Sequence, residues 1–554
     1  MKRLLPWVIV LGVGIISILP LTSDGYFPMH DDTQVARVIE MGRALRQGQF
    51  PVRWVGDLGF GYGYPLFNFY GPLPYYLGGV LYALGMPALL ATKMMFAVGV
   101  VGAALVMYGV ISSLVGWQAG MLASILYLFA PYHAVQIYVR GAVGEYWTLA
   151  FWPLLLLGFW GNQRSDRATT AWMLGSFGLA GAILSHTILG YVTTVFLILG
   201  LGLYWVVRWI IGQRERSWLV RHAKTLVFGL GLSAFFWLPA LYEMRYTSVA
   251  GQVSETANVS DHFVCWAQLW SSLWGFAGSA PGCIDGMSFM IGKLHLIVSG
   301  ITLAGWLMIR PKKNWAIVIL GITISLVGLF FATPTSEAVW SVLPGFRYVQ
   351  YPWRFLAVVN LGIALLGAGL VLLIPGTWKK TITAFALGIL IVAFNAKWFV
   401  PQYTYQKQNS EFEDAADLRW RVSKISDEYL PDFVPRPKDA SQIVSSTIAK
   451  RPGLIVTPFV STFKEERFIV ASTASGELTL YKAHFPGWRY YVNDIEVTPR
   501  MVGGLPNVIL PAGQSTLTLQ FTNTPVRQAG NMVSIVSFVL LVAVYYEKHK
   551  KTND

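Results

Sequence analysis

The stretch YFPMHDDTQVARVIEMGRALRQGQFPVRW, residues 26–54, places acidic side chains directly after an apolar run at 4–21. Asp31 and Asp32 are followed by an apolar stripe that begins at Val35, with arginines on the opposite side. This pattern predicts an amphipathic helix that lies on a membrane surface. One of the two aspartates could instead cap this helix. Acidic groups near a membrane boundary often have a function, so the stretch is a candidate site.

The composition around this stretch is that of a membrane protein. The chain has 554 residues, of which 54% are hydrophobic and only 13% are charged, whereas soluble domains carry about 25% charged residues. Many windows exceed the ~18 apolar residues that a spanning helix needs. We therefore expect a mainly α-helical polytopic membrane protein with about 12 spanning helices. The expected spans are 4–21 (read as uncleaved), 93–113, 118–136, 146–161, 171–187, 189–211, 224–242, 290–309, 315–332, 354–375, 381–398 and 529–546.

The net charge of +14 is concentrated in short loops and at the two ends of the chain. Such clusters face the cytoplasm under the positive-inside rule. The basicity therefore sets orientation, and it gives no reason to expect a nucleic-acid partner. We expect both termini inside, in a cytoplasmic membrane of the bacterial type. The basic clusters are Lys2/Arg3, Arg164/Arg167, Arg214/Arg216/Arg221/Lys224, Arg310/Lys312/Lys313, Lys379/Lys380 and Lys548/Lys550/Lys551.

This topology divides the chain into three expected domains. They are a transmembrane domain at 1–398, an extracytoplasmic β-rich domain at 399–527, and a last helix with a basic tail at 528–554. The apolar run 71–87 is expected to be re-entrant or interfacial, because a crossing there would turn the basic loop at 162–170 outward. The outer segments of the first domain are then 22–70, 137–145, 243–289 and 333–353, with a short turn around His186.

The segment 399–527 alternates polar and apolar residues between Pro, Gly and Asn, as in WRYYVNDIEV. This pattern predicts a small β-sandwich. Its first part, EFEDAADLRWRVSKI, is predicted to be helical or a linker. Upstream, Cys265 and Cys283 share one outer segment, where either a disulfide or two unpaired thiols is expected.

Several charged groups lie at the outer ends of spans, where lysine and arginine are otherwise scarce. Arg140 could hold a phosphate and Glu145 could act as a base or metal ligand, or the two could simply form an ion pair. His186 could reach a phosphate or sugar, or cap a tight turn. Arg354 is expected to bind an anionic ligand, with snorkelling to headgroups as the alternative. Further candidates for binding the substrate or its phosphate, also at outer positions, are His30, Glu243 and Gln350.

The sequence contains no P-loop, no H-E-x-x-H motif and no Rossmann glycine pattern. These absences do not indicate ATP or a nucleotide sugar as a substrate. Because no ATP is available outside the cytoplasm, a substrate used there must arrive already activated, as a lipid-linked sugar phosphate does. Four motifs in this order, MHDD, YVRGAVGE, VQYPWRFL and HFPGWRYYVND, resemble the GT-C glycosyltransferases. Within that superfamily the chain is most similar to bacterial membrane proteins related to 6-pyruvoyl-tetrahydropterin synthase and to those of the YfhO type.

The resemblance implies transfer of a sugar from a polyprenyl-phosphate donor to a lipid, glycan or protein acceptor, with inversion at the anomeric carbon. Asp31 or Asp32 would be the general base. Arg140 and Arg354 would stabilise the departing phosphate. Glu145 matches a second acidic position, and with the two aspartates it could bind Mg²⁺ or Mn²⁺. The rival hypotheses are a non-enzymatic transporter or flippase for lipid-linked glycans and an assembly protein.

Overall fold

The structure, a computed structural model, describes residues 4–161, 168–213, 215–249, 258–309, 315–343 and 345–553. The chain packs as two units. The first comprises Met1–Asp31, Lys93–Leu230 and Val253–Gln406, and the second comprises Asp32–Thr92, Gly231–Gln252 and Lys407–Asp554. The basic side chains expected in cytoplasmic loops at residues 2–3, 164, 167, 214 and 310–313 lie outside the described residues.

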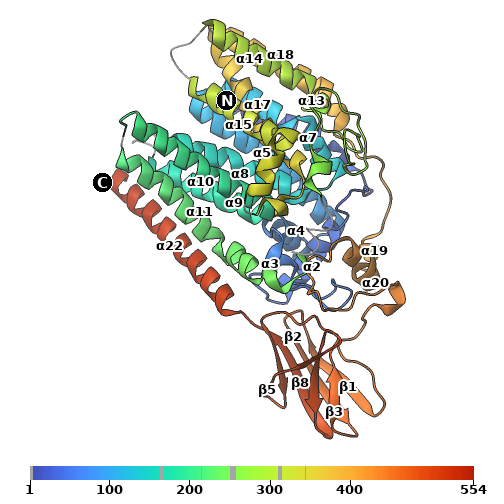
Figure 1. The fold of residues 1–554 in the computed structure, drawn as a ribbon. Helices are drawn as coiled ribbons and strands as arrows, with labels where there is room; N and C mark the ends of the chain where they lie inside the picture. Colours follow the sequence, from blue (N-terminus) through green and yellow to red (C-terminus); the bar gives the residue numbers. More distant parts are fainter. Residues whose placement is uncertain are drawn as a thin grey trace. The chain divides into compact units, whose positions relative to one another are not determined.

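The first unit is helical, and long apolar segments form most of its helices (Figure 1). Helices α5 and α11 continue across the division between the units. The helices are α1 (Leu5–Ile18), α5 (Ala88–Val115), α6 (Trp117–Leu128), α7 (Pro131–Ala134), α8 (Val143–Gly161), α9 (Ala168–Ser185), α10 (Thr187–Ile210), α11 (Arg216–Glu243), α13 (Trp266–Trp270), α14 (Lys293–Ile309), α15 (Trp315–Ala332), α16 (Glu337–Val342), α17 (Leu356–Leu373) and α18 (Thr377–Asn395).

Eight helices of the described chain are long and apolar enough to cross a membrane. The number becomes nine when Trp117–Leu128 and Pro131–Val139, which are bent by 50° at their junction, count as one span. The sequence predicted about 12, and this number is not confirmed. Two of the expected spans, 171–187 and 290–309, correspond to the shorter apolar stretches Thr170–Ser185 and Lys293–Ile309, which are not among these eight. The chain is thus a multi-pass membrane protein by the length and composition of its helices.

Helix α17 is the centre of the first unit. It packs against α6, α14 and α15, and 83% of its apolar window is buried within the protein. A membrane helix that is apolar on all sides and also covered by other helices contacts little lipid. By contrast, only 11% of the apolar window of the last helix, α22 (Pro525–Asn553), is buried.

The second unit contains the amphipathic helix that the sequence predicted, α2 (Gln34–Arg46), packed on α4 (Leu73–Ala83). Helix α4 has 11 residues, roughly 16 Å at 1.5 Å per residue, which is too short to cross a bilayer core. The two backbones come close at Gly42 and Gly79, where a Cβ on Gly79 would overlap Met41. The other helices of this unit are α3 (Leu66–Phe69), α19 (Asn409–Phe412), α20 (Ala415–Asp417), α21 (Ser423–Ile425) and α22.

The polar face of α2 is only partly exposed: Arg46 is exposed and Arg43 is half-buried, whereas Arg37 and Glu40 are buried. Arg37 is buried and donates to Ser426 Oγ at 3.1 Å, and its guanidinium lies 3.9 Å from the ring centroid of Tyr70. Glu40 on the same helix is fully buried. Other segments of the same unit therefore cover the part of this face that carries Arg37.

The β-rich segment forms two antiparallel sheets (Figure 1). The strand order is β1-β2-β8-β4-β5 in one sheet and β3-β7-β6 in the other. The alternating pattern of EERFIVAS appears as alternating burial along β2, as expected for a strand with one covered face. A β-rich region is therefore present, whereas a sandwich is not established. The strands are β1 (Leu454–Ser461), β2 (Glu465–Ser472), β3 (Gly476–Thr479), β4 (Trp488–Val492), β5 (Ile495–Val497), β6 (Arg500–Val502), β7 (Leu505–Leu510) and β8 (Gly513–Phe521).

Candidate functional site

A tight turn between the π-helical segment Val135–Val139 and α8 forms the first part of the candidate site. Gly141 adopts a φ of 63°, and a Cβ there would overlap the Met29 side chain. Only glycine adopts this left-handed conformation without steric cost. The turn is closed by hydrogen bonds from Ala142 N to Gln136 O (2.8 Å) and from Glu145 N to Ala142 O (3.0 Å). It brings residues 140 and 145 onto one side of the chain.

Glu145 lies between two arginines of the first unit. Arg140 Nη1 and Nη2 each donate to one carboxylate oxygen at 2.7 Å. Arg354 Nε lies 3.1 Å from Glu145 Oε1, in an ion pair whose geometry is not that of a hydrogen bond. Gln136 Nε2 donates to Oε2 at 3.2 Å. Since all these side chains are buried, the carboxylate is engaged on both oxygens away from water.

Aromatic and polar groups from the segment VQYPWRFL hold the two guanidiniums in place. The Arg140 guanidinium lies 4.3 Å from the ring centroid of Trp353, within the range of a cation–π contact. Arg354 Nη1 donates to Val349 O at 2.6 Å and to Gln350 Oε1 at 3.4 Å. Gln350 itself has a φ of 66°, which is unusual for a residue other than glycine. This segment thus orients Arg354 towards Glu145.

The motif MHDD reaches this cluster through its backbone. His30 N donates to Val139 O at 3.1 Å, and Asp31 N donates to Arg140 O at 3.0 Å. The Asp31 carboxylate lies near enough to interact electrostatically with the Arg140 guanidinium. The His30 ring is exposed and its Nε2 lies 3.0 Å from Phe276 O. Asp31 therefore stands beside Arg140 within the first unit.

Asp32 belongs to the second unit, where it pairs with Arg421. Arg421 Nη1 donates to Asp32 Oδ2 at 3.0 Å, and its Nε donates to Asp417 Oδ1 at 2.8 Å. These three residues line one small pocket with Phe412. Burial raises the pKa of Asp32 above its usual range, although Arg421 opposes the shift. The N-cap of α2 is Thr33, and its side chain makes no capping bond. The N-cap position thus falls to Thr33 and not to Asp31 or Asp32, and the Asp32 carboxylate is turned to Arg421.

His186 caps helix α10, as one of the two interpretations from sequence expected. Its Nδ1 accepts from Leu189 N at 3.1 Å. The side chain is nearly buried and lies close enough to Glu145 for an electrostatic interaction. His186 thus lies next to the cluster, and its ring also caps the N-terminus of α10.

Glu243 is occupied by protein groups in the second unit. Its carboxylate accepts from Arg527 Nε and Nη2 at 3.0 and 2.9 Å, from Asn68 Nδ2 at 2.8 Å and from Thr524 Oγ1 at 2.7 Å. Glu243 and Arg527 are almost completely buried. This arrangement favours a structural role for Glu243 over contact with a substrate.

The residues expected to bind a metal do not fit that task. The described part of the chain contains no group of three or more His, Cys, Asp or Glu side chains placed to hold an ion. Glu145 in particular directs both oxygens at guanidinium groups, whereas a hard cation needs oxygen ligands that are not already neutralised. We therefore assign no step to Mg²⁺ or Mn²⁺.

Sequence reasoning missed Trp353 as a contact of Arg140 in the first unit, and Arg421 as the partner of Asp32 in the second. Arg421 and Asp417 lie in the segment predicted to be helical or a linker, where their i,i+4 spacing was a usable signal for a helical ion pair. Nothing in the local sequence pointed from Arg421 to Asp32, 389 residues away.

No protein-family model matches the chain. An uncharacterized protein of Lactococcus lactis subsp. cremoris (strain MG1363) is 25% identical over 254 residues, which cover 43% of this chain and 40% of that protein. The alignment thus spans less than half of the length of this relative.

Two solved structures match part of the chain. The arabinofuranosyltransferase AftD from Mycobacteria matches with a TM-score of 0.44 and 13% identity, over 73% of this chain and 27% of AftD. ArnT from Cupriavidus metallidurans, solved with bound undecaprenyl phosphate, matches with a TM-score of 0.31 and 12% identity, over 72% of this chain and 89% of ArnT. Neither TM-score is high enough to establish a common fold.

Proposed function

We propose that the chain is a membrane glycosyltransferase of the GT-C type. It transfers a sugar from a polyprenyl-phosphate donor to a lipid, glycan or protein acceptor on the extracytoplasmic side of a bacterial-type cytoplasmic membrane. The observation that carries the proposal is the buried cluster in which Arg140 and Arg354 share the single carboxylate of Glu145, with Asp31 bonded to the backbone of Arg140. It combines an anion-binding centre with an adjacent candidate base.

The charges of this cluster suit a phosphate. Two guanidiniums and one carboxylate leave one positive charge, which Asp31 balances while it is ionised. Once Asp31 accepts a proton, the cluster again carries one net positive charge next to the departing phosphate. Charge that develops on a leaving group is stabilised best by preorganised cations away from bulk water. The buried arginines meet that requirement without rearrangement.

The proposed step is a single displacement at the anomeric carbon. The acceptor hydroxyl oxygen forms a bond to this carbon while Asp31 takes the hydroxyl proton. The bond between the anomeric carbon and the phosphate oxygen breaks, and its electron pair stays on the polyprenyl phosphate. Attack from the face opposite the leaving group inverts the configuration. No other reactant is required, because the donor is already activated.

Glu145 acts as a positioning residue in this scheme. Its two oxygens fix the bidentate Arg140 and the approach of Arg354, and a carboxylate held this way is a poor base. Trp353 and Gln350 then orient the same arginines from the other side. Asp32 is assigned no proton transfer, since it is held by Arg421.

The proposal is tested by reconstituting the full chain in vesicles with a panel of polyprenyl-phosphate sugars and candidate acceptors. The measured quantities are release of polyprenyl phosphate and the anomeric configuration of the product. Asp31→Asn is expected to lose nearly all turnover, whereas Asp32→Asn serves as the neighbouring control. Movement of the intact donor between leaflets without release of polyprenyl phosphate would instead identify a flippase. Full turnover in Asp31→Asn would overturn the assignment of the base.

A further inference from the structure

The segment between Cys265 and Cys283 exposes large apolar side chains, whereas a loop that faces water usually exposes polar ones. Between these cysteines, which form a disulfide with 5.7 Å between their Cα atoms, the chain reads WAQLWSSLWGFAGSAPG and contains no charged residue. The large side chains that are most exposed there and just beyond are apolar, namely Trp266 (58%), Trp270 (51%), Leu273 (76%) and Ile284 (64%).

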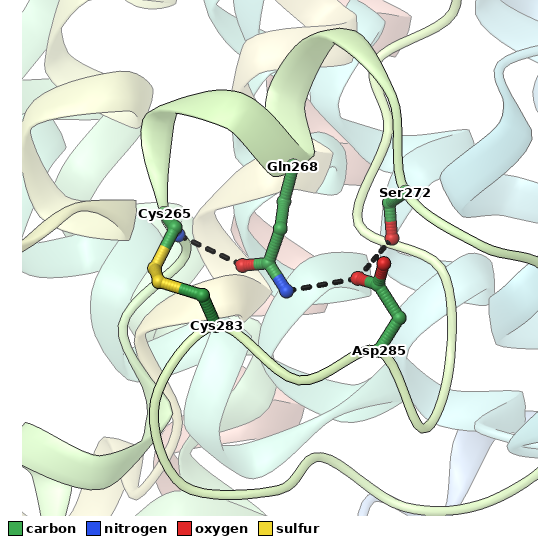
Figure 2. The surroundings of a disulfide bond; sticks show 5 residues. All are labelled: Cys265, Gln268, Ser272, Cys283 and Asp285. Carbon is green, nitrogen blue, oxygen red and sulfur yellow. Dashed lines mark hydrogen bonds between the residues drawn. A yellow bond between two sulfur atoms is a disulfide. The ribbon is translucent and has the colours of Figure 1, made fainter.

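The polar groups of this segment are instead turned towards one another (Figure 2). Gln268 accepts from Cys265 N at 2.9 Å and donates to Asp285 Oδ1 at 2.8 Å. Asp285 also accepts from Ser272 Oγ at 2.6 Å and from Leu273 N at 2.9 Å. The carboxylate nearest to the exposed side chains is thus satisfied within the loop.

The exposed side chains continue into a helix that is itself apolar. Ile291 N donates to Leu269 O at 3.0 Å, which joins the loop to the start of α14. Lys293 at that start lies 5.9 Å from the ring centroid of Trp270. Further along α14, Ile297 and Ile301 are exposed one helical turn apart. An apolar helix with a lysine and tryptophans at one end is the arrangement that anchors a segment at the boundary between lipid and water.

We propose that Trp266, Trp270, Leu273 and Ile284 form a docking surface for the membrane itself, seated in the headgroup region of a phospholipid bilayer. Tryptophan rings prefer this region, and a surface without charge avoids the cost of dehydrating ions there. Monomeric proteins in water seldom leave such groups of large apolar side chains exposed together. The inward polar network keeps Asp285 out of the lipid. The inference concerns membrane attachment and does not depend on the proposed transferase activity.

The test places a nitroxide label on this surface in the full chain, reconstituted in phosphatidylcholine–phosphatidylglycerol nanodiscs. Trp266→Cys and, separately, Leu273→Cys are labelled with the disulfide kept oxidised. Ile455→Cys on strand β1 is the control, because its side chain is 70% exposed and apolar. The measured quantities are collision rates with oxygen, which partitions into lipid, and with a water-soluble nickel chelate.

Labels at 266 and 273 are expected to collide several times more often with oxygen than with the nickel chelate, whereas the label at 455 should show the opposite preference. Equal accessibility to the nickel chelate at all three positions would show that the loop faces water and would overturn the proposal. Protection from both reagents, or dipolar coupling between labels, would point to a protein partner or a second copy and would also overturn it.

Discussion

The Arg140 guanidinium donates two hydrogen bonds of 2.7 Å to the two carboxylate oxygens of Glu145, and both side chains are buried. Removing one partner of such a pair leaves a buried charge without compensation and costs about 3–5 kcal/mol. We expect Glu145→Gln to lower the thermal unfolding temperature in nanodiscs and to reduce turnover. Arg140→Gln combined with Glu145→Gln should recover part of the lost stability, because only Arg354, and no longer both arginines, is then left without the carboxylate. Additive losses in the double variant would argue against the pairing.

Asp31 and Asp32 are predicted to differ sharply in their contribution to turnover. Loss of a general base typically lowers the rate by roughly 10²–10⁴-fold, so Asp31→Asn should fall in this range with little change in unfolding temperature. Asp32→Asn should have a smaller effect, because Asp417 still holds Arg421. Steady-state kinetics with one donor and one acceptor compare the two variants. A larger loss for Asp32→Asn would transfer the proposed role to that residue.

Replacing Arg421 should change the pKa of Asp32. Burial raises this pKa, and the Arg421 guanidinium is the strongest influence that opposes the rise. In Arg421→Gln the pKa of Asp32 should therefore rise further, so that the carboxylate ionises only at higher pH. The folded state then gains stability at low pH relative to high pH, compared with the wild type. Thermal unfolding between pH 4 and 8 measures the difference.

Arg436→Gln is the matched control for this experiment. Arg436 forms a partly exposed ion pair with Asp427 in the same unit, at 2.7 Å, whereas the charged groups that act on Asp32 are Arg421, Lys407 and Asp417. If the two variants show the same dependence of unfolding temperature on pH, the coupling between Arg421 and Asp32 is refuted.

Glu40 gives a second prediction about pH. Burial, followed by the neighbouring Asp57 carboxylate, raises the pKa of Glu40 from 4.5 to about 8. Between these pH values the folded protein keeps a proton that the unfolded chain has released. The contribution of this group to stability is therefore complete below pH 4.5 and is lost as the pH rises through 8. Glu40→Gln should flatten this decline, measured as unfolding temperature from pH 5 to 9. Parallel curves for variant and wild type would contradict the shift.

Substituting Glu243 distinguishes a structural role of this residue from a role in binding substrate. Because its carboxylate already accepts four hydrogen bonds from Arg527, Asn68 and Thr524, Glu243→Gln should lower the unfolding temperature while leaving KM of the folded fraction unchanged. The expectation from sequence that Glu243 binds substrate predicts the opposite result. Kinetics at a temperature well below unfolding distinguish the two outcomes.

The parts of the fold that follow from local patterns were predictable from the sequence. The apolar run at 354–375 predicted a spanning helix, which is α17, and the alternation in WRYYVNDIEV predicted strands, which are β4 and β5. The short spacing of Arg140 and Glu145 suggested their ion pair. Pairings that join distant segments, such as Asp32 with Arg421, were not predictable, because periodicity and spacing report only neighbours along the chain. The burial of Arg37 and Glu40 on α2 was not predictable for the same reason.

The pairing of Glu243 with Arg527 has a consequence for how the protein is made. The two residues are 284 positions apart, so a ribosome adding about 5–20 residues per second needs roughly 15–60 s between them. During this interval the carboxylate lacks the arginine that donates two hydrogen bonds to it in the finished chain, and its burial is correspondingly less favourable. A nascent chain must therefore keep the end of α11 hydrated or held by a chaperone until its final helix emerges. Chains truncated before residue 527 should be recognised as incomplete by cellular proteases, however well their earlier helices have inserted.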